Sequence, residues 1–292
     1  MSDRLIEFKT EEEAKRYAVA CTSAFFTLEE AQERIQDYKT YIKNANTEEQ
    51  QEYWTNELKK LEKWLSSEKF KNGDYSQGID ALILDLIELR ASIYAFQNTK
   101  SQIYPFNKYI FHAQWLTGST YTIFSIIGKL VSKDKRDNSL RKLWDNTSQY
   151  IEVSDLSKTE EINKIKDKMQ DKNGHFTNSN SKALLYRNKF ISHNESMPRI
   201  CWSDIDDDIK IIVRLWSLIT MWSSSGILYP FQAGEAVFSG LDNIYSQDEI
   251  KALINKRGEY LRMIKEWCVC SLIDGEQSSN RTPFATISFK NA

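Results

Sequence analysis

The chain has 292 residues, enough for one large domain or two modest ones, and 41% of them are hydrophobic, which suffices for a substantial core. The sequence holds only 10 glycines and 4 prolines. Such a scarcity of turn-forming residues disfavours a β-sandwich or a glycine-rich nucleotide-binding fold and favours long helices. The 39 basic and 41 acidic side chains give a formal charge of -2, so no overall field draws the chain to nucleic acid or anionic lipid. We therefore predict an all-α protein in which any nucleic-acid contact depends on a local basic patch.

The four cysteines are Cys21, Cys201 and the closely spaced pair Cys268 and Cys270. The spacing of the pair is too tight for the usual zinc knuckle and does not resemble the disulfide framework of a secreted domain. We expect reduced thiols, and we predict neither a metal site nor a cofactor.

The segment 1–7 has neither the basic nor the apolar region of a secretory signal. The longest apolar stretch, Ile209–Trp222, is interrupted by Lys210 and Arg214 and is shorter than the roughly 20 residues that a membrane span needs. We therefore expect a cytoplasmic protein that does not enter a membrane.

Two capping boxes open the first predicted helices. They are Thr27 with Glu30 and Thr47 with Gln50, pairs whose side chains can satisfy free amides of a first helical turn. Apolar residues at three-and-four spacing follow each box, namely Leu28, Ala31, Ile35, Tyr38 and Ile42, then Trp54, Leu58, Leu61 and Leu65. We expect residues 1–70 to form an N-terminal helical hairpin that packs on the rest of the protein.

A polar stretch from Lys69 to Gly78 marks the predicted boundary before the main body. Two long apolar helices are expected after it, over Ile79–Asn98 and Lys108–Val131, and the breadth of their apolar stripes indicates burial on more than one side. A shorter helix near Ser139–Tyr150 precedes a polar segment, Ser154–Asn180, which we predict to be a partly helical, mobile insertion. Residues 75–245 are assigned to a helical bundle.

Helix is expected to resume at Ser181 and again at Ser203. In the second case Asp204, Asp206, Asp207 and Asp208 are interpreted as first-turn acids that offset the helix dipole. A last helix begins at Ser246, where Glu249 completes a capping box. We expect residues 246–292 to form a C-terminal helix and tail packed on the bundle.

Histidine is the usual acid or base near neutral pH, and the chain has only His112, His175 and His193. His112 lies beside Trp115 on an aromatic helix and is predicted to be a satisfied core or interface residue. His175 follows Gly174 in the polar segment and is predicted to be solvated. His193 differs because of the residues that precede it.

Residues 187–194 read Arg-Asn-Lys-Phe-Ile-Ser-His-Asn. This string resembles the signature of the HEPN superfamily, most closely its abortive-infection branch, in which an arginine and a polar residue precede a short apolar run and a histidine. The resemblance covers roughly Ile79–Trp222. It implies a HEPN-like helical bundle and a two-fold homodimer whose paired motifs line one cleft. Some HEPN proteins are modified on a tyrosine two places after the histidine, but Glu195 stands there, which argues against such regulation here.

The chemistry of metal-independent RNA cleavage explains why an arginine and a histidine would occur together in this motif. Such cleavage needs a group that moves protons and a positive charge on the pentavalent phosphorane. His193 suits the first role and Arg187 the second, so both are predicted to be catalytic. Asn188, Ser192 and Asn194 are predicted to orient them, and Lys182, Lys189 and Arg199 to bind phosphate or RNA.

Six positions along an α-helix turn through about 600°, which places Arg187 and His193 about 120° apart. Either the helix ends near Ser192 and His193 turns back, or a second chain completes the site. In a purely structural alternative, Arg187 pairs with Asp204 or Glu195 and His193 caps the helix.

Two functions are consistent with these residues. The first is a metal-independent endoribonuclease that acts as a toxin or abortive-infection effector in anti-phage defence, with RNA as substrate and an antitoxin protein as a candidate partner. The second is a non-catalytic HEPN-like helical module that binds RNA, a nucleotide or a protein partner.

Overall fold

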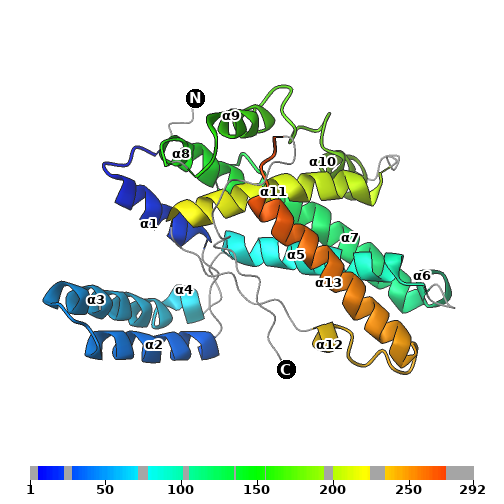
Figure 1. Cartoon of the computed structure of the whole chain (residues 1–292), viewed down its shortest axis with the longest axis horizontal. Coiled ribbons are helices and arrows are strands. Elements are labelled where there is room, and N and C mark those ends of the chain that lie inside the picture. The colour runs from blue at the N-terminus through cyan, green and yellow to red at the C-terminus, as the bar shows by residue number, and fades with distance from the viewer. Residues whose placement is uncertain are drawn as a thin grey trace. The chain divides into compact units, whose positions relative to one another are not determined.

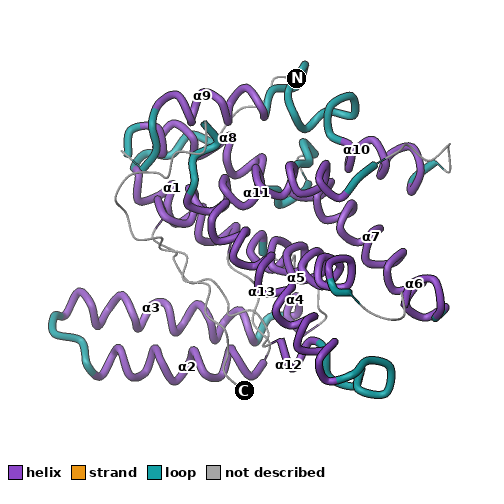
Figure 2. Tube along the Cα trace, turned by 45° about the vertical axis from the view of Figure 1, so that its right-hand side comes forward, coloured by secondary structure: helices purple, strands orange, loops and turns teal. Residues whose placement is uncertain are grey.

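The computed structural model describes residues 6–22, 28–71, 78–100, 105–134, 136–154, 156–193, 200–223 and 234–273. Every regular element in these ranges is helical, which confirms the predicted all-α class (Figure 2). None of the described helices is long and apolar enough to cross a membrane. The chain divides into two compact units, one of residues 24–78 and one of residues 1–23 together with 79–292.

The smaller unit is a helical hairpin of α2 (Leu28–Lys43) and α3 (Glu48–Leu65), followed by the single turn α4 (Glu68–Lys71). The second predicted capping box is present, because the Thr47 hydroxyl accepts a hydrogen bond from Gln50 N at 3.2 Å. The first box falls partly on Thr27, which lies outside the described residues. The Trp54 ring joins the two helices through Tyr38 and Tyr41, with centroids 5.5 and 4.9 Å apart.

The first helix, α1 (Glu11–Thr22), belongs to the larger unit, whereas the sequence prediction grouped residues 1–70 together. Ala14 and Ala18 are fully buried there, and α1 packs against three other helices of that unit. The Trp222 indole also donates to the Glu11 carboxylate at 3.0 Å. Small residues on one face thus let α1 approach the core closely.

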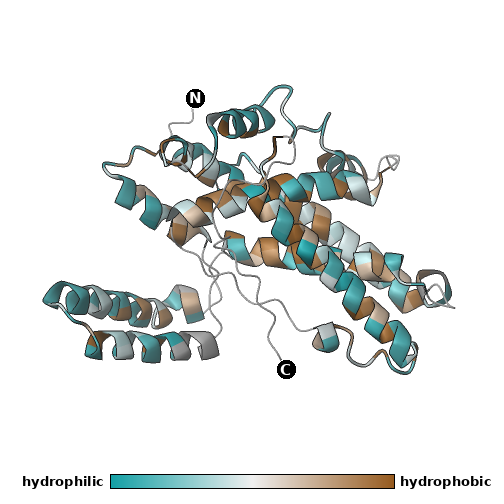
Figure 3. Ribbon diagram, viewed as in Figure 1, coloured by the Kyte–Doolittle hydropathy of each residue, from teal (hydrophilic) through white to brown (hydrophobic). Residues whose placement is uncertain are grey.

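The core of the larger unit is built by four long helices (Figure 1). They are α5 (Ile79–Asn98), α7 (Ile110–Leu130), α11 (Trp202–Ser223) and α13 (Gln247–Val269). Helix α5 packs against α7 and α13, and α11 also packs against α13. Apolar residues gather on α5 and α11, whereas α13 shows polar residues outward (Figure 3). Because α13 packs against both α5 and α11, the C-terminal helix contributes directly to the core.

Shorter helices complete the unit, namely α6 (Pro105–Lys108), α8 (Leu140–Glu152), α9 (Thr159–Lys168), α10 (Lys182–Tyr186), the π-helical η1 (Arg187–Ile191) and α12 (Gly234–Val237). The segment predicted as a mobile insertion contains α9 and packs into the core, with Ile162 and Ile165 fully buried. Its following turn is closed by hydrogen bonds from His175 N to Lys168 O and from the Asn180 side chain to Gly174 O.

Two of the four acidic residues at the start of α11, Asp206 and Asp208, bind residues distant in sequence, which corrects their interpretation as first-turn acids. Asp204 does lie in the first turn, where it accepts from Cys201 N at 2.8 Å. Asp206 receives two hydrogen bonds from Arg90, at 2.9 and 2.7 Å, and one from the Tyr260 hydroxyl at 2.7 Å. The Arg90 guanidinium also lies 4.7 Å from the Trp202 ring centroid. Asp206 therefore ties α11 to α5 and α13.

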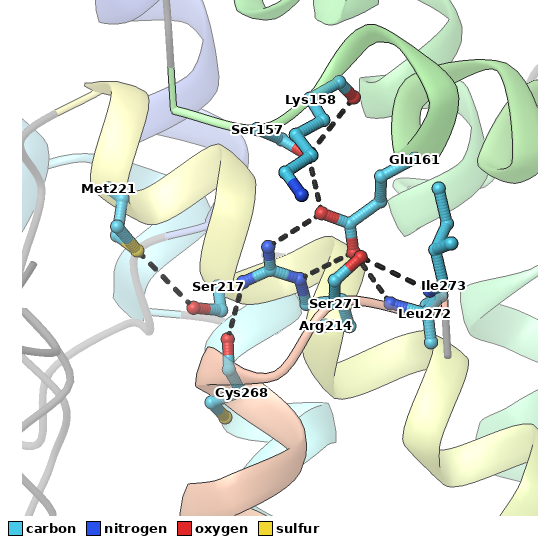
Figure 4. Close-up of polar contacts among 10 residues, drawn as sticks. All are labelled: Ser157, Lys158, Glu161, Arg214, Ser217, Met221, Cys268, Ser271, Leu272 and Ile273. Carbon is cyan, nitrogen blue, oxygen red and sulfur yellow. Dashed lines mark hydrogen bonds and ion pairs between the residues drawn. The ribbon is translucent and has the colours of Figure 1, made fainter. Parts of the chain in front are cut away.

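A fully buried ion pair joins α9 to α11 and to the end of α13 (Figure 4). Arg214 donates to both carboxylate oxygens of Glu161 at 2.9 and 2.8 Å, and both side chains are only 1% exposed. Arg214 also donates to Cys268 O at 2.8 Å, and Leu272 N donates to Glu161 at 2.9 Å. Burial alone would raise the pKa of Glu161, but the hydrogen bonds and charge of Arg214, together with hydrogen bonds from Ser157 and Leu272 N, outweigh it and lower that pKa, so the carboxylate stays charged.

We expect Glu161→Gln to lower the free energy of unfolding by about 3–5 kcal/mol, because it leaves the buried Arg214 charge uncompensated. Denaturant unfolding followed by circular dichroism measures this. The matched control is Glu259→Gln, which breaks the half-exposed pair with Lys256 on α13 and should change stability by no more than about 0.5 kcal/mol. Equal losses in the two variants would contradict a special role for the buried pair.

Candidate functional site

The predicted motif lies on a helix that starts at a buried cap. Ser181 precedes α10, and its hydroxyl accepts from Leu184 N at 3.2 Å, as the sequence prediction of a helix start there requires. Tyr186 is buried and packs on Phe124 of α7, with ring centroids 4.7 Å apart. The apolar side of the helix therefore attaches the motif to α7.

At Arg187 the α-helix becomes one turn of π-helix. Ser192 N donates to Arg187 O at 3.0 Å, so this bond joins residues five positions apart instead of four. Ser192 thus takes the place above Arg187 that residue i+4 has in an α-helix. A continued turn would put His193 one position further, roughly 140° around the axis from Arg187. Single π-turns within α-helices are frequent at functional sites, but this one does not bring the two residues onto one face.

The Arg187 side chain lies against the backbone of α7 at Gly128. A Cβ atom on Gly128 would come within 2.6 Å of Arg187 Cδ and 2.7 Å of Nε, so glycine is needed to leave room for it. Arg187 Nη1 donates to Asn188 Oδ1 at 3.3 Å, and Asn188 Nδ2 donates to Asn178 Oδ1 at 2.7 Å. The guanidinium is thereby held in a half-buried position.

The structural alternative paired Arg187 with one of two acids, Asp204 or Glu195. Among the described residues no carboxylate forms an ion pair with Arg187, and Asp204 accepts from Cys201 N instead. Glu195 lies outside the described residues. Within the part of the chain that the structure describes, no acidic side chain therefore balances the charge of Arg187.

The other predicted residues fall into two groups. Ser192 and His193 are exposed in the turn that follows η1, and Lys182 and Lys189 are exposed on α10 and η1. Asn194 and Arg199 lie outside the described residues. Of the predicted set, the structure joins Arg187 to Asn188 by a hydrogen bond and leaves the imidazole of His193 accessible to a ligand.

A carboxylate from α11 anchors the beginning of the motif helix. Asp208 is 1% exposed, and it accepts from the Ser181 hydroxyl at 2.7 Å while its other oxygen lies 2.6 Å from His175 Nε2. The prediction that His175 is solvated was therefore wrong, since its side chain is 24% exposed and paired. Asp208 positions the cap of α10, and through it the start of the motif.

Two positioning residues, Gly128 and Asp208, were not identified as such from the sequence. An isolated glycine within the apolar helix Lys108–Val131 was the available signal, because a glycine in a helix interior usually has a packing reason. No comparable signal marks Asp208, since its partner Ser181 is 27 positions away along the chain.

The described residues contain no group of three or more His, Cys, Asp or Glu side chains that could hold a metal ion. What the motif does offer is a fixed guanidinium, an accessible imidazole and two exposed lysines. These groups can bind a phosphate and transfer protons.

Comparisons with protein-family models, with curated proteins and with solved structures each found no match. The chemistry of the site therefore has to be argued from its own residues.

We expect Gly128→Ala to displace the Arg187 side chain while the fold survives. The added methyl group would occupy the space of Arg187 Cδ and Nε, which can move, and alanine favours helix over glycine by about 1 kcal/mol. The Nε–H resonance of Arg187 in ¹⁵N-edited NMR, assigned with Arg187→Lys, should shift, and the melting temperature should stay near that of the wild type.

Gly118→Ala is the matched control, because it lies on the same helix and its Cβ would meet no atom within 4 Å. An Arg187 resonance that moves no more in Gly128→Ala than in this control would contradict the packing of Arg187 on Gly128.

Proposed function

We propose that this chain is a metal-independent endoribonuclease of the HEPN type, acting as a toxin or abortive-infection effector in anti-phage defence. One observation carries the proposal, namely that Arg187 has no acidic partner among the described residues. Four arginines are at most 4% exposed, and each is paired with a carboxylate: Arg90 with Asp206, Arg141 with Asp171, Arg214 with Glu161 and Arg257 with Glu88. Arg187 is half-buried and bonds only to an amide oxygen among the described residues. A half-buried cation without an acid is suited to an anionic ligand.

Phosphate is the anion that fits the neighbouring groups. The planar guanidinium of Arg187 can donate to two oxygens of a phosphodiester, and the exposed Lys182 and Lys189 add positive charge around it. His193 can exchange a proton with the 2′-hydroxyl or with the leaving 5′-oxygen, because imidazole titrates near neutral pH. Asn188 holds the guanidinium, and Ser192 lies on its face of the π-turn. Asn194 and Arg199 complete the proposed set.

Cleavage needs both a base and an acid, and one chain supplies one motif histidine. If the helix continued by one residue beyond the π-turn, His193 would lie roughly 140° around the axis from Arg187. A two-fold pair of chains with facing motifs would provide two histidines and two arginines in one cleft. The proposal therefore includes a homodimer. An antitoxin protein that covers this cleft would be a further partner.

The separation of Arg187 and His193 on one chain also favours a second candidate function. A monomer with this geometry would bind phosphate through Arg187 without cleaving it. The chain would then be a non-catalytic HEPN-like module for RNA, a nucleotide or a protein partner.

We expect the purified chain to cleave single-stranded RNA in the presence of EDTA and to leave 2′,3′-cyclic phosphate ends. His193→Ala should reduce the rate by at least about 10²-fold, the usual scale for a general acid or base. Arg187→Ala should abolish cleavage, and Arg187→Lys should restore little of it because lysine lacks the planar fork. Product ends are identified by mass spectrometry.

Arg136→Ala serves as the control, since it removes an arginine that is 88% exposed and paired with Asp134, outside the motif. Cleavage that survives in the double variant of Arg187 and His193 would show a contaminant or another site. Binding of RNA that depends on Arg187 without any cleavage would establish the second function instead.

The homodimer makes a separate prediction. Light scattering should give the mass of two chains. A structure of the dimer should show an interface that buries more than about 1,000 Å² in total. In mixtures of wild-type and His193→Ala chains, activity should fall more steeply than the wild-type fraction, because a mixed pair keeps only one of the two histidines. A monomeric mass at concentrations where RNA is cleaved would refute the shared cleft.

A further inference from the structure

A cavity of about 390 Å³ lies in the larger unit between α5, α7 and the turn that follows α12. Its walls include Phe96 of α5, Trp115 of α7 and Phe238 after α12. The volume lies in the lower part of the 300–1,000 Å³ range that is typical of small-molecule sites. The cavity is thus large enough for a metabolite-sized ligand and too small for a folded partner.

Four wall residues are Phe or Trp, and three of their rings contact one another through Phe96. Phe96 makes edge-to-face contacts with Trp115 and Phe238, at centroid distances of 5.6 and 5.7 Å. Phe96 and Phe238 are at most 9% exposed. Phe111 also lines the cavity but is 74% exposed, so it lies where the cavity opens to solvent. Such walls favour a ligand with its own π-system, because aromatic rings attract one another in offset and edge-to-face arrangements.

The cavity wall also contains a buried imidazole, and one of its two nitrogens has no hydrogen-bond partner among the described residues. His112 is 6% exposed, and among the described residues its Nδ1 finds no hydrogen-bond partner. His112 was predicted to be a satisfied core or interface residue; it is buried as a core residue is, but its Nδ1 is not satisfied among the described residues. A buried polar group left unpaired is costly, and a ligand can remove that cost. Ser92, 8% exposed, adds a hydroxyl to the same wall.

The charge of the cavity is balanced without a ligand. Among the described wall residues the charged one is Glu88, which receives hydrogen bonds from Arg257 Nη2 at 2.7 Å to each carboxylate oxygen. Burial lowers the pKa of His112, which keeps the imidazole neutral near pH 7. An ion would therefore have to leave water without meeting an opposite free charge, which is unfavourable.

We propose that this cavity binds a neutral, planar aromatic heterocycle of one or two rings, with hydrogen-bonding groups on its edge that reach His112 and Ser92. The inference goes beyond the proposed nuclease. His112 and Gly128 lie 16 positions apart on α7, which separates the cavity from Arg187 by roughly 24 Å along the helix. The two sites can therefore fail or succeed independently.

The test uses the full chain with indole and adenine as neutral probes. The Trp115 indole N–H resonance, assigned with Trp115→Phe, should shift on titration of either probe into the wild type. Benzoate, which is planar but charged, and cyclohexanol, which is neutral but not planar, should bind at least about tenfold more weakly. This measurement does not depend on the folding of any cavity variant.

Two cavity variants and one control locate the site. His112→Leu should lower the affinity for adenine about tenfold, and Val237→Trp, which fills the cavity, should abolish binding. Ile110→Ala changes an apolar residue on the same helix that is 77% exposed and should leave binding unchanged. An unmoved Trp115 resonance at millimolar probe would overturn the proposal. So would equal binding of benzoate, or full binding by a folded Val237→Trp.

Discussion

The buried pair of Glu161 and Arg214 constrains the rest of the larger unit. Taking two charges out of water is costly, and only close, complete pairing compensates for it. Here the pair is bidentate. Arg214 also donates to Cys268 O, and Glu161 also accepts from the Ser157 hydroxyl and from Leu272 N, just beyond α13. Three segments distant in sequence therefore meet at one point.

The buried pair of Glu161 and Arg214 is connected to the motif through α11. Arg214 and Asp208 lie on the same helix, and Asp208 accepts from Ser181 at the cap of α10. A second attachment comes from α7, where Gly128 leaves room for the Arg187 side chain. The motif helix is thus fixed at its start by a hydrogen bond and at Arg187 by packing. A guanidinium held in this way has lost much of its conformational freedom before any ligand arrives.

Local patterns in the sequence were sufficient to predict the helices, because caps and apolar spacing depend on near neighbours. Thr47, Ser181 and Ser246 all act as the predicted caps. The roles of polar side chains were harder to predict, since their partners are distant in sequence. Asp206 and Asp208 looked like first-turn acids, yet they bind Arg90 and His175, 116 and 33 positions away. Hydrophobic periodicity shows which residues share a helix face, but it does not show which distant residue a polar side chain binds.

The π-turn at Arg187 links the geometry of the motif to its chemistry. In an ordinary α-helix Ile191 would lie above Arg187, and an apolar side chain would then cover the guanidinium. The extra residue of the π-turn puts the small, polar Ser192 there and ends the helix before His193. Arg187 is half-buried, and His193 is exposed in the turn that follows. In the proposed nuclease, Arg187 would hold the phosphate, but the in-line geometry of RNA cleavage requires groups on opposite sides of the phosphorus. Within that proposal, the separation of Arg187 and His193 on one chain is the reason that a second chain, facing the first, would be needed.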